Sequence, residues 1–420
     1  MNIEEKINYC LNCKNPQCKK MCPLENDIPG FIHALKDDNY EKAYDILTKT
    51  TILSSICGRI CPHLKQCQKG CIRGIKGEPV SIGELESKVG DWALENKDSL
   101  LESFKRQEMT DKNIDKKIAV IGGGPSGLTC VAFLRKQGYS VTIYEKYNSL
   151  GGILKRGIPD FRLQNEIVDK VILQILNLGI DVKYGKELGK NLSIKELEKE
   201  YDAIYLSVGA NIPRKMAIEG EELNGVYGGN TLLENGEHPN YEGKKVAIIG
   251  GGNVAMDCAR TIKKKGADVI VIYRRSEEEM PAEKKEIQDA KNEGIKFLFL
   301  NNIVKIIGKN KVEKIECIKT KLVKKDGEIR LSPINIENSN YILNMDYVVM
   351  AVGGKIDKEM LELEGFETTK NKYLKVNENY MTSKDKVFAG GDVIGETSTV
   401  AWAASNGRKV AYEIDKCLNK

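Results

Sequence analysis

Residues 116–146 read KKIAVIGGGPSGLTCVAFLRKQGYSVTIYEK. The apolar run 118–121 predicts a buried strand, and the pattern Gly122-x-Gly124-x-x-Gly127 follows it and opens a predicted helix. A second predicted strand ends at Glu145, about 20 residues further on, where such folds place an acidic residue against a ribose hydroxyl. Together these features predict a strand–helix–strand unit that binds a dinucleotide pyrophosphate at the helix N-terminus, rather than a plain glycine-rich turn.

The same pattern occurs a second time. Residues 244–275 read KKVAIIGGGNVAMDCARTIKKKGADVIVIYRR, and they align with the first segment at an offset of 128 without a gap as far as Gly266. Gly250 and Gly252 keep the first two glycines of the pattern, whereas Ala255 replaces the third. The repeat therefore predicts a second dinucleotide-binding unit in the same chain.

The two units differ at the position that contacts the ribose. Arg274, followed by Arg275, stands where Glu145 stands in the first unit. A carboxylate repels a 2′-phosphate, whereas two arginines bind one through several hydrogen bonds. We therefore predict an adenine dinucleotide with a free ribose in the first unit and NADP in the second. The alternative for the two arginines is a pair of solvated surface charges.

The end of the chain completes the first unit. Residues 387–391 read VFAGG, which predicts a short strand and a turn, and Asp392 and a predicted helix at 398–417 follow. Two nucleotide-binding units, the second inserted into the first, are typical of flavoprotein pyridine-nucleotide oxidoreductases. A disulfide reductase of that architecture also needs a cysteine pair beside its flavin, but only isolated cysteines occur after Cys71. The sequence therefore argues against disulfide reduction.

Eight of the twelve cysteines precede residue 72. They form two runs, CLNCKNPQCKKMC at 10–22 and CGRICPHLKQCQKGC at 57–71. Closely spaced cysteines that include a Cys-Pro step suit [4Fe–4S] clusters. Two zinc sites of four ligands are an alternative, and disulfides are a weaker one because cytosolic thiols stay reduced. The spacing leaves open which cysteines share a cluster.

Composition narrows the class of protein. The 420 residues carry 65 lysines and arginines against 60 acidic residues, a net charge of +5 that is spread through mixed runs. This balance gives no reason to expect nucleic-acid binding. No apolar run approaches the length of about 18 residues that spans a membrane. The N-terminal MNIEEKINYC is polar and acidic, unlike a signal peptide, so we expect a cytoplasmic protein.

The combination of these parts resembles one family. A cysteine region, an FAD unit and an inserted NADP unit resemble the glutamate synthase small (beta) subunit. Its relatives are the large subunit of the NADH-dependent ferredoxin:NADP oxidoreductase and the N-terminal half of dihydropyrimidine dehydrogenase. Segments DIPGFIHAL (27–35), GRICP (58–62), EPVSIGELE (78–86) and YRRSEEEMPA (273–282) carry the resemblance, which covers essentially the whole chain.

The resemblance implies an α/β fold class with three domains. These are a mainly α-helical double [4Fe–4S] domain at 1–112, a Rossmann-like FAD-binding domain at 113–238 and 348–420, and an inserted Rossmann-like NADP(H)-binding domain at 239–347, as in glutathione reductase. The residues that it implies for FAD are Gly122, Gly124, Pro125, Ser126, Gly127, Glu145, Lys146, Gly152, Ile158, Arg162, Gly209, Gly391, Asp392, Thr399 and Val400. Those for NADP are Gly250, Gly252, Asn253, Val254, Ala255, Arg274, Arg275 and Gly353.

The resemblance also implies how the cysteines are shared between two [4Fe–4S] clusters. The first cluster takes Cys10, Cys13, Cys18 and Cys71. The second takes Cys22, Cys61, Cys67 and the oxygen ligand Glu86. This leaves Cys57 as a non-ligand, although spacing alone favours it as the eighth ligand. An oxygen ligand in place of a thiolate alters the charge and the potential of a cluster.

The family assignment implies a function. A hydride passes from NADPH to FAD, and single electrons then pass through the clusters to a partner subunit, so no acid–base residue is predicted. The leading interpretation is the NADPH-oxidising subunit of glutamate synthase, whose FMN-containing large subunit makes glutamate from glutamine and 2-oxoglutarate. The alternatives are the large subunit of an electron-bifurcating ferredoxin:NADP transhydrogenase with a ferredoxin-reductase-like partner, the electron-input subunit of another redox complex, and a non-catalytic module that holds zinc and senses a dinucleotide.

Overall fold

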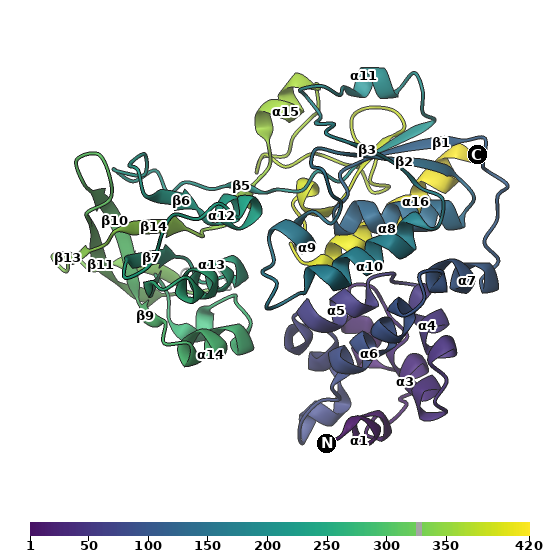
Figure 1. Ribbon diagram of the computed structural model, residues 1–420, viewed down its shortest axis with the longest axis horizontal. Helices are drawn as coiled ribbons and strands as arrows, with labels where there is room; N and C mark the ends of the chain where they lie inside the picture. Colours follow the sequence, from purple (N-terminus) through teal and green to yellow (C-terminus); the bar gives the residue numbers. More distant parts are fainter. Residues whose placement is uncertain (325–329) are drawn as a thin grey trace. The chain divides into compact units, whose positions relative to one another are not determined.

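The structure divides the chain into two units. The computed structural model describes residues 1–324 and 330–420 (Figure 1). The first unit comprises Met1–Lys155, Asp160–Ala210 and Ile356–Lys420, and the second comprises Arg156–Pro159 and Asn211–Lys355. The second unit thus interrupts the first in the sequence, which confirms the prediction that one dinucleotide fold is inserted into another.

The first glycine pattern follows the central strand of a parallel sheet. Strand β1 (Lys117–Ile121) pairs with β2 (Ser140–Glu145) on one side and with β4 (Ala203–Leu206) on the other. β3 (Asp181–Tyr184) and β16 (Val387–Ala389) complete the order β16-β4-β1-β2-β3. All residues of β1 after Lys117 are buried, as expected for a parallel sheet with both faces covered.

Three helices cover one face of this sheet. α8 (Pro125–Lys136) begins at the glycine loop, α10 (Asn165–Leu176) precedes β3, and α16 (Val400–Leu418) follows β16. In Figure 1 they lie between the sheet and the N-terminal helices. α8 and α16 pack closely, because a Cβ atom on Gly407 would lie only 2.1 Å from the Ser126 carbonyl oxygen. The shorter elements of this region are α9 (Ile153–Arg156), α11 (Ile194–Leu197), α15 (Lys358–Leu363) and the 3₁₀ turn η5 (Gly391–Ile394).

The N-terminal region is helical, as predicted. Its helices are α1 (Ile3–Asn8), α2 (Gln17–Met21), α3 (Ile28–Lys36), α4 (Tyr40–Thr48), α5 (Ser54–Ile60), α6 (Ile82–Leu94) and α7 (Ser99–Arg106). Three 3₁₀ turns carry the second cysteine run: η1 (His63–Lys65), η2 (Cys67–Gly70) and η3 (Ile72–Ile75). The fully buried Phe31, Ile32, Leu47 and Leu85 form the centre of a hydrophobic core against which several of the cysteines pack.

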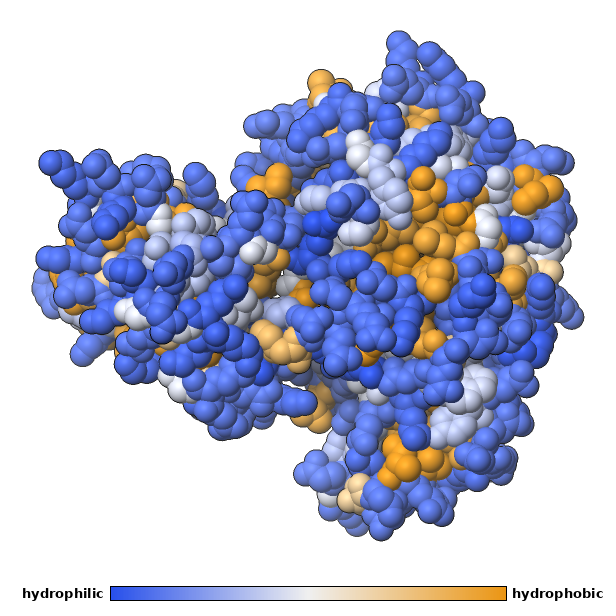
Figure 2. All heavy atoms as spheres, in the orientation of Figure 1, coloured by the Kyte–Doolittle hydropathy of each residue, from blue (hydrophilic) through white to orange (hydrophobic). Residues whose placement is uncertain are grey.

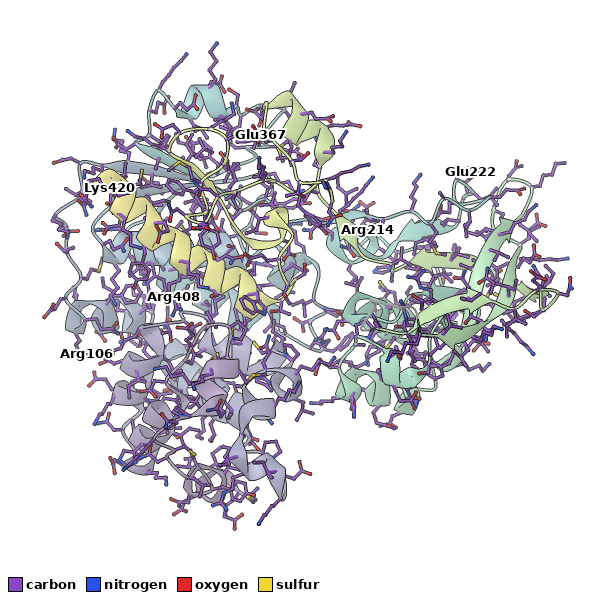
Figure 3. The ribbon with its side chains drawn as sticks, turned by 180° about the vertical axis from the view of Figure 1, so that it is seen from behind. Arg106, Arg214, Glu222, Glu367, Arg408 and Lys420 are labelled. Carbon is purple, nitrogen blue, oxygen red and sulfur yellow. The ribbon has the colours of Figure 1, made fainter. Side chains whose placement is uncertain are left out.

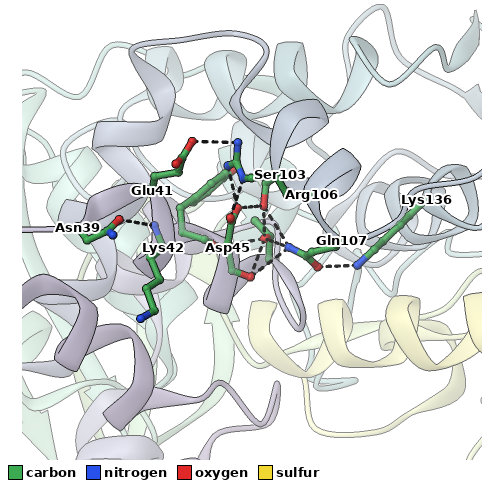
Figure 4. A network of polar contacts seen from close by, with 10 residues as sticks. Asn39, Glu41, Lys42, Asp45, Ser103, Arg106, Gln107 and Lys136 are labelled. Atoms are coloured by element: carbon green, nitrogen blue, oxygen red, sulfur yellow. Dashed lines mark hydrogen bonds and ion pairs between the residues drawn. The ribbon is translucent and has the colours of Figure 1, made fainter.

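A network of hydrogen bonds and ion pairs connects these helices to α8, which covers the first parallel sheet (Figure 4). Arg106 of α7 donates two hydrogen bonds to the Asp45 carboxylate of α4, at 2.7 and 2.8 Å. Gln107 donates to the Thr48 hydroxyl at 2.7 Å and accepts a hydrogen bond from Lys136 of α8 at 2.6 Å. Residues 1–112 therefore share one compact unit with the parallel sheet instead of forming a separate one.

The second unit repeats the sheet of the first. Its parallel sheet has the order β6-β14-β7-β8-β9, with the second glycine pattern after the central strand β7. The strands are β6 (Val226–Gly228), β7 (Lys245–Ile249), β8 (Asp268–Tyr273), β9 (Lys296–Phe299) and β14 (Tyr347–Met350). The helical elements are α12 (Gly229–Asn235), α13 (Asn253–Lys264), η4 (Glu277–Glu279) and α14 (Lys284–Asn292). An antiparallel sheet adds β10 (Asn301–Ile307), β11 (Lys314–Val323), β12 (Ser332–Asn335) and β13 (Tyr341–Asn344).

The second unit is longer than the 239–347 segment proposed for the NADP(H) domain. β6 pairs in parallel with β14, and the short strand β5 (Ile212–Pro213) pairs with β15 (Gly354–Lys355). These pairings join residues 211–238 and 348–355 to the second unit. Strands of two or three residues lack a periodic pattern, so the sequence did not reveal them. The division into three cofactor-binding domains stays a prediction.

Candidate cofactor-binding sites

The first glycine loop has the geometry that a pyrophosphate requires. Gly122 adopts a positive φ of 102°, and a Cβ atom on Gly127 would lie 2.0 Å from the Gly122 carbonyl oxygen. Only glycine at both positions allows this close turn. α8 starts at Pro125 after Gly124, and no side chain caps its N-terminus. Its first backbone N–H groups can therefore bind an anion.

Glu145 lies where a ribose contact is expected. The carboxylate is buried at the end of β2 and accepts hydrogen bonds from the backbone N–H groups of Gly123 at 2.8 Å and Tyr147 at 3.0 Å. These bonds hold the carboxylate against the glycine loop. Gly152 reaches the same loop, because a Cβ atom on it would lie 2.9 Å from the Gly124 Cα atom. Of the other predicted FAD residues, Lys146 and Arg162 belong to the first unit, whereas Ile158 is grouped with the second.

The second predicted FAD motif meets the first. A Cβ atom on Gly391 would lie 3.1 Å from the Ser126 Cβ atom, and Gly391 donates its backbone N–H to the Asn406 side chain at 3.1 Å. Burial raises the pKa of Asp392, and a hydrogen bond with Ser398 opposes that rise. Thr399 caps α16 by accepting from the Trp402 backbone N–H at 3.3 Å.

Sequence reasoning missed two of the residues that shape this region. The Ser207 hydroxyl donates toward the carbonyl oxygens of Ile121 at 3.0 Å and Gly122 at 2.8 Å, and Asn406 holds Gly391 as described. Both lie far in sequence from the glycine loop and belong to no recognised spacing, so the sequence carried no signal for them.

The second glycine loop has a matching form. Gly250 has a φ of 143°, and a Cβ atom on it would lie 2.2 Å from the Ala351 carbonyl oxygen. α13 begins at Asn253 after Gly252, again without a side-chain cap. The Asn253 side chain accepts a hydrogen bond from the Glu283 backbone N–H at 3.0 Å. The other predicted positions are the buried Ala255, its neighbour Val254, and Gly353, which has a φ of 105°.

Three arginines, not two, gather where the 2′-phosphate is expected. Burial lowers the pKa of Arg274, and the neighbouring Arg275 and Arg330 lower it further. Arg330 donates to the Tyr273 hydroxyl at 2.9 Å and to the Glu279 carbonyl oxygen. Arg275 donates to the Leu331 carbonyl oxygen at 3.0 Å. Three guanidinium groups in one place suit a dianionic phosphate, and sequence reasoning missed Arg330 because 55 residues separate it from Arg275.

The first predicted cluster set is brought together in space. Burial raises the pKa of Cys18 to about 11, and the nearby Cys71, Cys10 and Cys13 raise it further. The pKa of Cys10 is likewise raised by burial and by its neighbours Cys13 and Cys71. The four thiols that the family pairing assigns to one cluster are therefore neighbours, although they come from both cysteine runs.

The second predicted set lies deeper. Burial and the neighbouring Glu86 raise the pKa of Cys22 to about 12, and burial, Glu86 and Cys22 raise that of Cys67. A hydrogen bond with Cys57 and burial raise the pKa of Cys61. Burial raises the pKa of Glu86 itself to about 8. The four predicted ligands are thus neighbours, and Cys57 is a neighbour of Cys61 and Cys22, so the structure leaves the eighth ligand open between Cys57 and Glu86.

Glycines bring the helices that carry Glu86 and Cys61 into close contact. A Cβ atom on Gly58 of α5 would lie 2.4 Å from the Gly83 carbonyl oxygen and 2.4 Å from the Ser87 backbone nitrogen, both on α6. Glu86 stands between those two α6 residues and is 5% exposed. The Asn26 amide donates to its carboxylate at 3.1 Å. The close approach of backbones therefore sets the position of Glu86.

A chain of hydrogen bonds connects Glu86 with α16, the helix that follows the second predicted FAD motif. The Thr50 hydroxyl donates to Asn26 at 2.7 Å, and Arg408 of α16 donates to the Thr50 carbonyl oxygen at 3.1 Å. Figure 3 shows Arg408 on α16, beside the N-terminal helices. The second set thus lies close to the helix that follows the second FAD motif.

The donor set fits iron–sulfur clusters. Buried thiols with raised pKa values stay protonated unless a cation compensates their charge, and the irons of a [4Fe–4S] cluster supply that charge. Each predicted set consists of soft or anionic side chains that are neighbours in the structure. Among residues 1–324 and 330–420, no three His, Cys, Asp or Glu side chains form a group that could hold a metal ion.

Comparisons with known proteins agree with this arrangement. Residues 116–407 match the family model described as pyridine nucleotide-disulphide oxidoreductase. Residues 2–98 match the model described as dihydropyrimidine dehydrogenase domain II, 4Fe-4S cluster. The glutamate synthase [NADPH] small chain of Halomonas elongata is 32% identical over 97% of this chain and 89% of its own length. That of Escherichia coli is 31% identical, with the same coverage.

The chain belongs to the glutamate synthase small-chain family. It is an NADPH-dependent oxidoreductase with FAD and [4Fe–4S] iron–sulfur as cofactors, which confirms those predictions. The same matches confirm the prediction of an electron-transfer subunit. They also confirm the α/β fold class with two Rossmann-type folds. The number of clusters and the individual binding residues stay predictions. None of the described helices is long and apolar enough to cross a membrane.

Other relatives and solved structures show how widely this architecture is used. The beta subunit of the NADP⁺-dependent formate dehydrogenase of Moorella thermoacetica is 34% identical over 96% of this chain, which spans only 60% of that subunit. FprA of Mycobacterium tuberculosis in complex with NADPH superposes with a TM-score of 0.63 at 19% identity, covering 72% of this chain and 84% of that one. That likeness shows the fold alone.

Proposed function

We propose that this chain is the NADPH-oxidising subunit of a glutamate synthase. The observation that carries the proposal is the similarity to glutamate synthase small chains over 89% of their length. The beta subunits of the formate dehydrogenase and the NADPH-Fe³⁺ oxidoreductase are also similar to this chain. However, this chain covers only 60% and 64% of their lengths, respectively. The partner in the proposal is an FMN-containing large subunit that makes glutamate from glutamine and 2-oxoglutarate.

The residues of the chain bind and orient the cofactors. When bound, NADPH, FAD and two [4Fe–4S] clusters supply hydride transfer, the step from two electrons to one, and conduction of single electrons. The uncapped α8 and α13 N-termini would hold the two pyrophosphates through backbone N–H groups. Glu145 selects a free ribose in the first unit, and Arg274 and Arg275 with Arg330 bind the 2′-phosphate in the second.

The cysteine region provides the exit for electrons. The second set, Cys22, Cys61, Cys67 and Glu86, lies on the side of α16, and the first set, Cys10, Cys13, Cys18 and Cys71, lies beyond it. Cys67 is a neighbour of both Cys22 and Cys18, so it joins the two sets. If both sets held clusters, the second set would stand between the region of α16 and the first set.

Anaerobic purification from the native source, with mass spectrometry of the proteins that co-elute, tests the proposal. We expect a large FMN-containing amidotransferase subunit, and NADPH oxidation by the complex that depends on both glutamine and 2-oxoglutarate. A ferredoxin-reductase-like partner instead of that subunit contradicts the proposal and favours the electron-bifurcating transhydrogenase. A dehydrogenase partner specific for another substrate favours an electron-input subunit of that complex.

A further inference from the structure

The two segments that contain the cysteine runs are rich in basic residues. Seven of the eight N-terminal cysteines, all but Cys57, lie in residues 6–24 and 58–77. These two segments carry nine lysines and arginines and no acidic residue. Lys6 and Arg59 are paired with Glu84 and Asp91. Five further lysines are exposed and form no ion pair among the residues that the structure describes: Lys14, Lys19, Lys20, Lys69 and Lys76.

Exposed apolar side chains accompany these lysines. Leu11 adjoins Cys10 and is 52% exposed, and Ile72 adjoins Cys71 and is 53% exposed. Ile75 is 75% exposed, and Met21 also lies at the surface. Figure 2 shows hydrophobic side chains at the surface of the N-terminal helical region among hydrophilic ones. Large apolar side chains exposed in a group mark a surface that another molecule covers.

These residues lie together because the segments that carry them pack on one another. A Cβ atom on Gly70 of η2 would lie 2.7 Å from the Gln17 carbonyl oxygen and 2.9 Å from the Met21 Cγ atom, so η2 packs on α2. The Arg73 guanidinium of η3 lies 4.3 Å from the centre of the Tyr9 ring and donates to the Tyr9 carbonyl oxygen at 3.0 Å. Segments 9–11, 17–21 and 69–76 therefore surround the first cysteine set.

We propose that this surface docks a redox protein whose own face carries acidic residues around an apolar centre. We name it the cysteine rim, and its members are Leu11, Lys14, Lys19, Lys20, Met21, Lys69, Ile72, Ile75 and Lys76. The lysines attract and orient the acidic face, and the apolar side chains exclude water beside Cys10 and Cys71. The inference deepens the proposed function, because it defines where and to what chemistry the chain passes its electrons.

The test uses two haem proteins of opposite surface charge as probes with the reconstituted full-length holoprotein. Cytochrome b5 presents an acidic face, and mitochondrial cytochrome c a basic one. Binding of each is measured directly, by fluorescence titration at low and at high salt, without NADPH. We expect wild-type protein to bind cytochrome b5 in a salt-sensitive manner and to bind cytochrome c more weakly.

Charge reversal in the cysteine rim supplies the decisive variants. The combined change of Lys19→Glu, Lys20→Glu, Lys69→Glu and Lys76→Glu is expected to weaken cytochrome b5 binding about tenfold or more, which is the scale of electrostatic steering. The combined change of Lys42→Glu, Lys97→Glu, Lys105→Glu and Lys112→Glu is the matched control, because these four lysines are exposed on residues 1–112 away from the cysteines. Ile75→Ser is expected to weaken binding without removing its dependence on salt.

Separate measurements keep the two proposals apart. Iron content per FAD shows that the variants still assemble their clusters, and NADPH-driven reduction of ferricyanide, a small acceptor, tests the flavin step. Equal cytochrome b5 affinity in the rim and control variants overturns the docking inference, as does wild-type binding that is absent or independent of salt. Failure of NADPH to reduce ferricyanide contradicts the proposed function but leaves the binding result to decide the inference.

Discussion

Replacing Gly58 by alanine tests the link between helix packing and the second cysteine set. Gly58 lies on α5, three residues before Cys61. It contacts Gly83 and Ser87 of α6, which precede and follow Glu86 in the sequence. An added Cβ atom would meet the Gly83 carbonyl oxygen and the Ser87 nitrogen at 2.4 Å. Both are backbone atoms, so no side-chain rotation can relieve the contact.

The size of the disturbance follows from these distances. Ordinary contacts of a Cβ atom begin at 3.4 Å, so α5 and α6 must separate by about 1 Å. Ligand positions in metal sites tolerate about 0.2 Å. The overpacking costs about 1–3 kcal/mol, partly offset by the gain of about 1 kcal/mol in helix propensity. We therefore expect the protein to fold while Cys61 and Glu86 lose their common position.

The assay is iron and labile sulfide per FAD after anaerobic reconstitution, with electron paramagnetic resonance of the dithionite-reduced protein. Gly58→Ala is expected to lose about half of the iron and one of two cluster signals, and to keep NADPH–ferricyanide activity. Gly74→Ala is the control, because its added Cβ atom would meet Pro79 at an ordinary 3.6 Å in the same cysteine region. Full iron and unchanged spectra in Gly58→Ala refute the reasoning.

Three further predictions concern the eighth ligand, the nucleotide and pH. Glu86→Ala is expected to lose about half of the iron and Cys57→Ala to keep it, and the opposite result makes Cys57 the ligand. Arg330→Gln should raise the KM for NADPH about tenfold and leave the KM for NADH unchanged, because a charged hydrogen bond contributes about 1.5–3 kcal/mol. An equal rise in KM for both nucleotides contradicts a contact between Arg330 and the 2′-phosphate. Burial lowers the pKa of Lys136 from 10.5 to about 8. As the pH rises, Lys136 therefore loses its proton in the folded protein before it does so in the unfolded chain. The stability of wild type relative to Lys136→Met should therefore rise between about pH 8 and 10.5, by about 1 kcal/mol after allowance for partial exposure, and urea unfolding that shows no such rise contradicts it.

Local patterns predicted the parts of the fold that depend on neighbouring residues. The two glycine patterns follow buried strands and open helices at Pro125 and Asn253, as expected, because a glycine loop, a strand and a helix leave a regular trace within about 30 residues. The helix expected at 398–417 is α16. The strands β5 and β6 were not predicted, because their place depends on β15 and β14, more than a hundred residues away in the sequence.

The sequence by itself determined the kinds of cofactor. Glycines at fixed spacing, an acidic or a basic strand end and closely spaced cysteines are chemical requirements, and each is met within a short segment. Only the tertiary structure brought Arg330 to Arg274 and Asn26 to Glu86, and only it gathered the exposed lysines around Cys10 and Cys71. Those contacts arise from packing between distant segments, and no local pattern encodes which segments will meet.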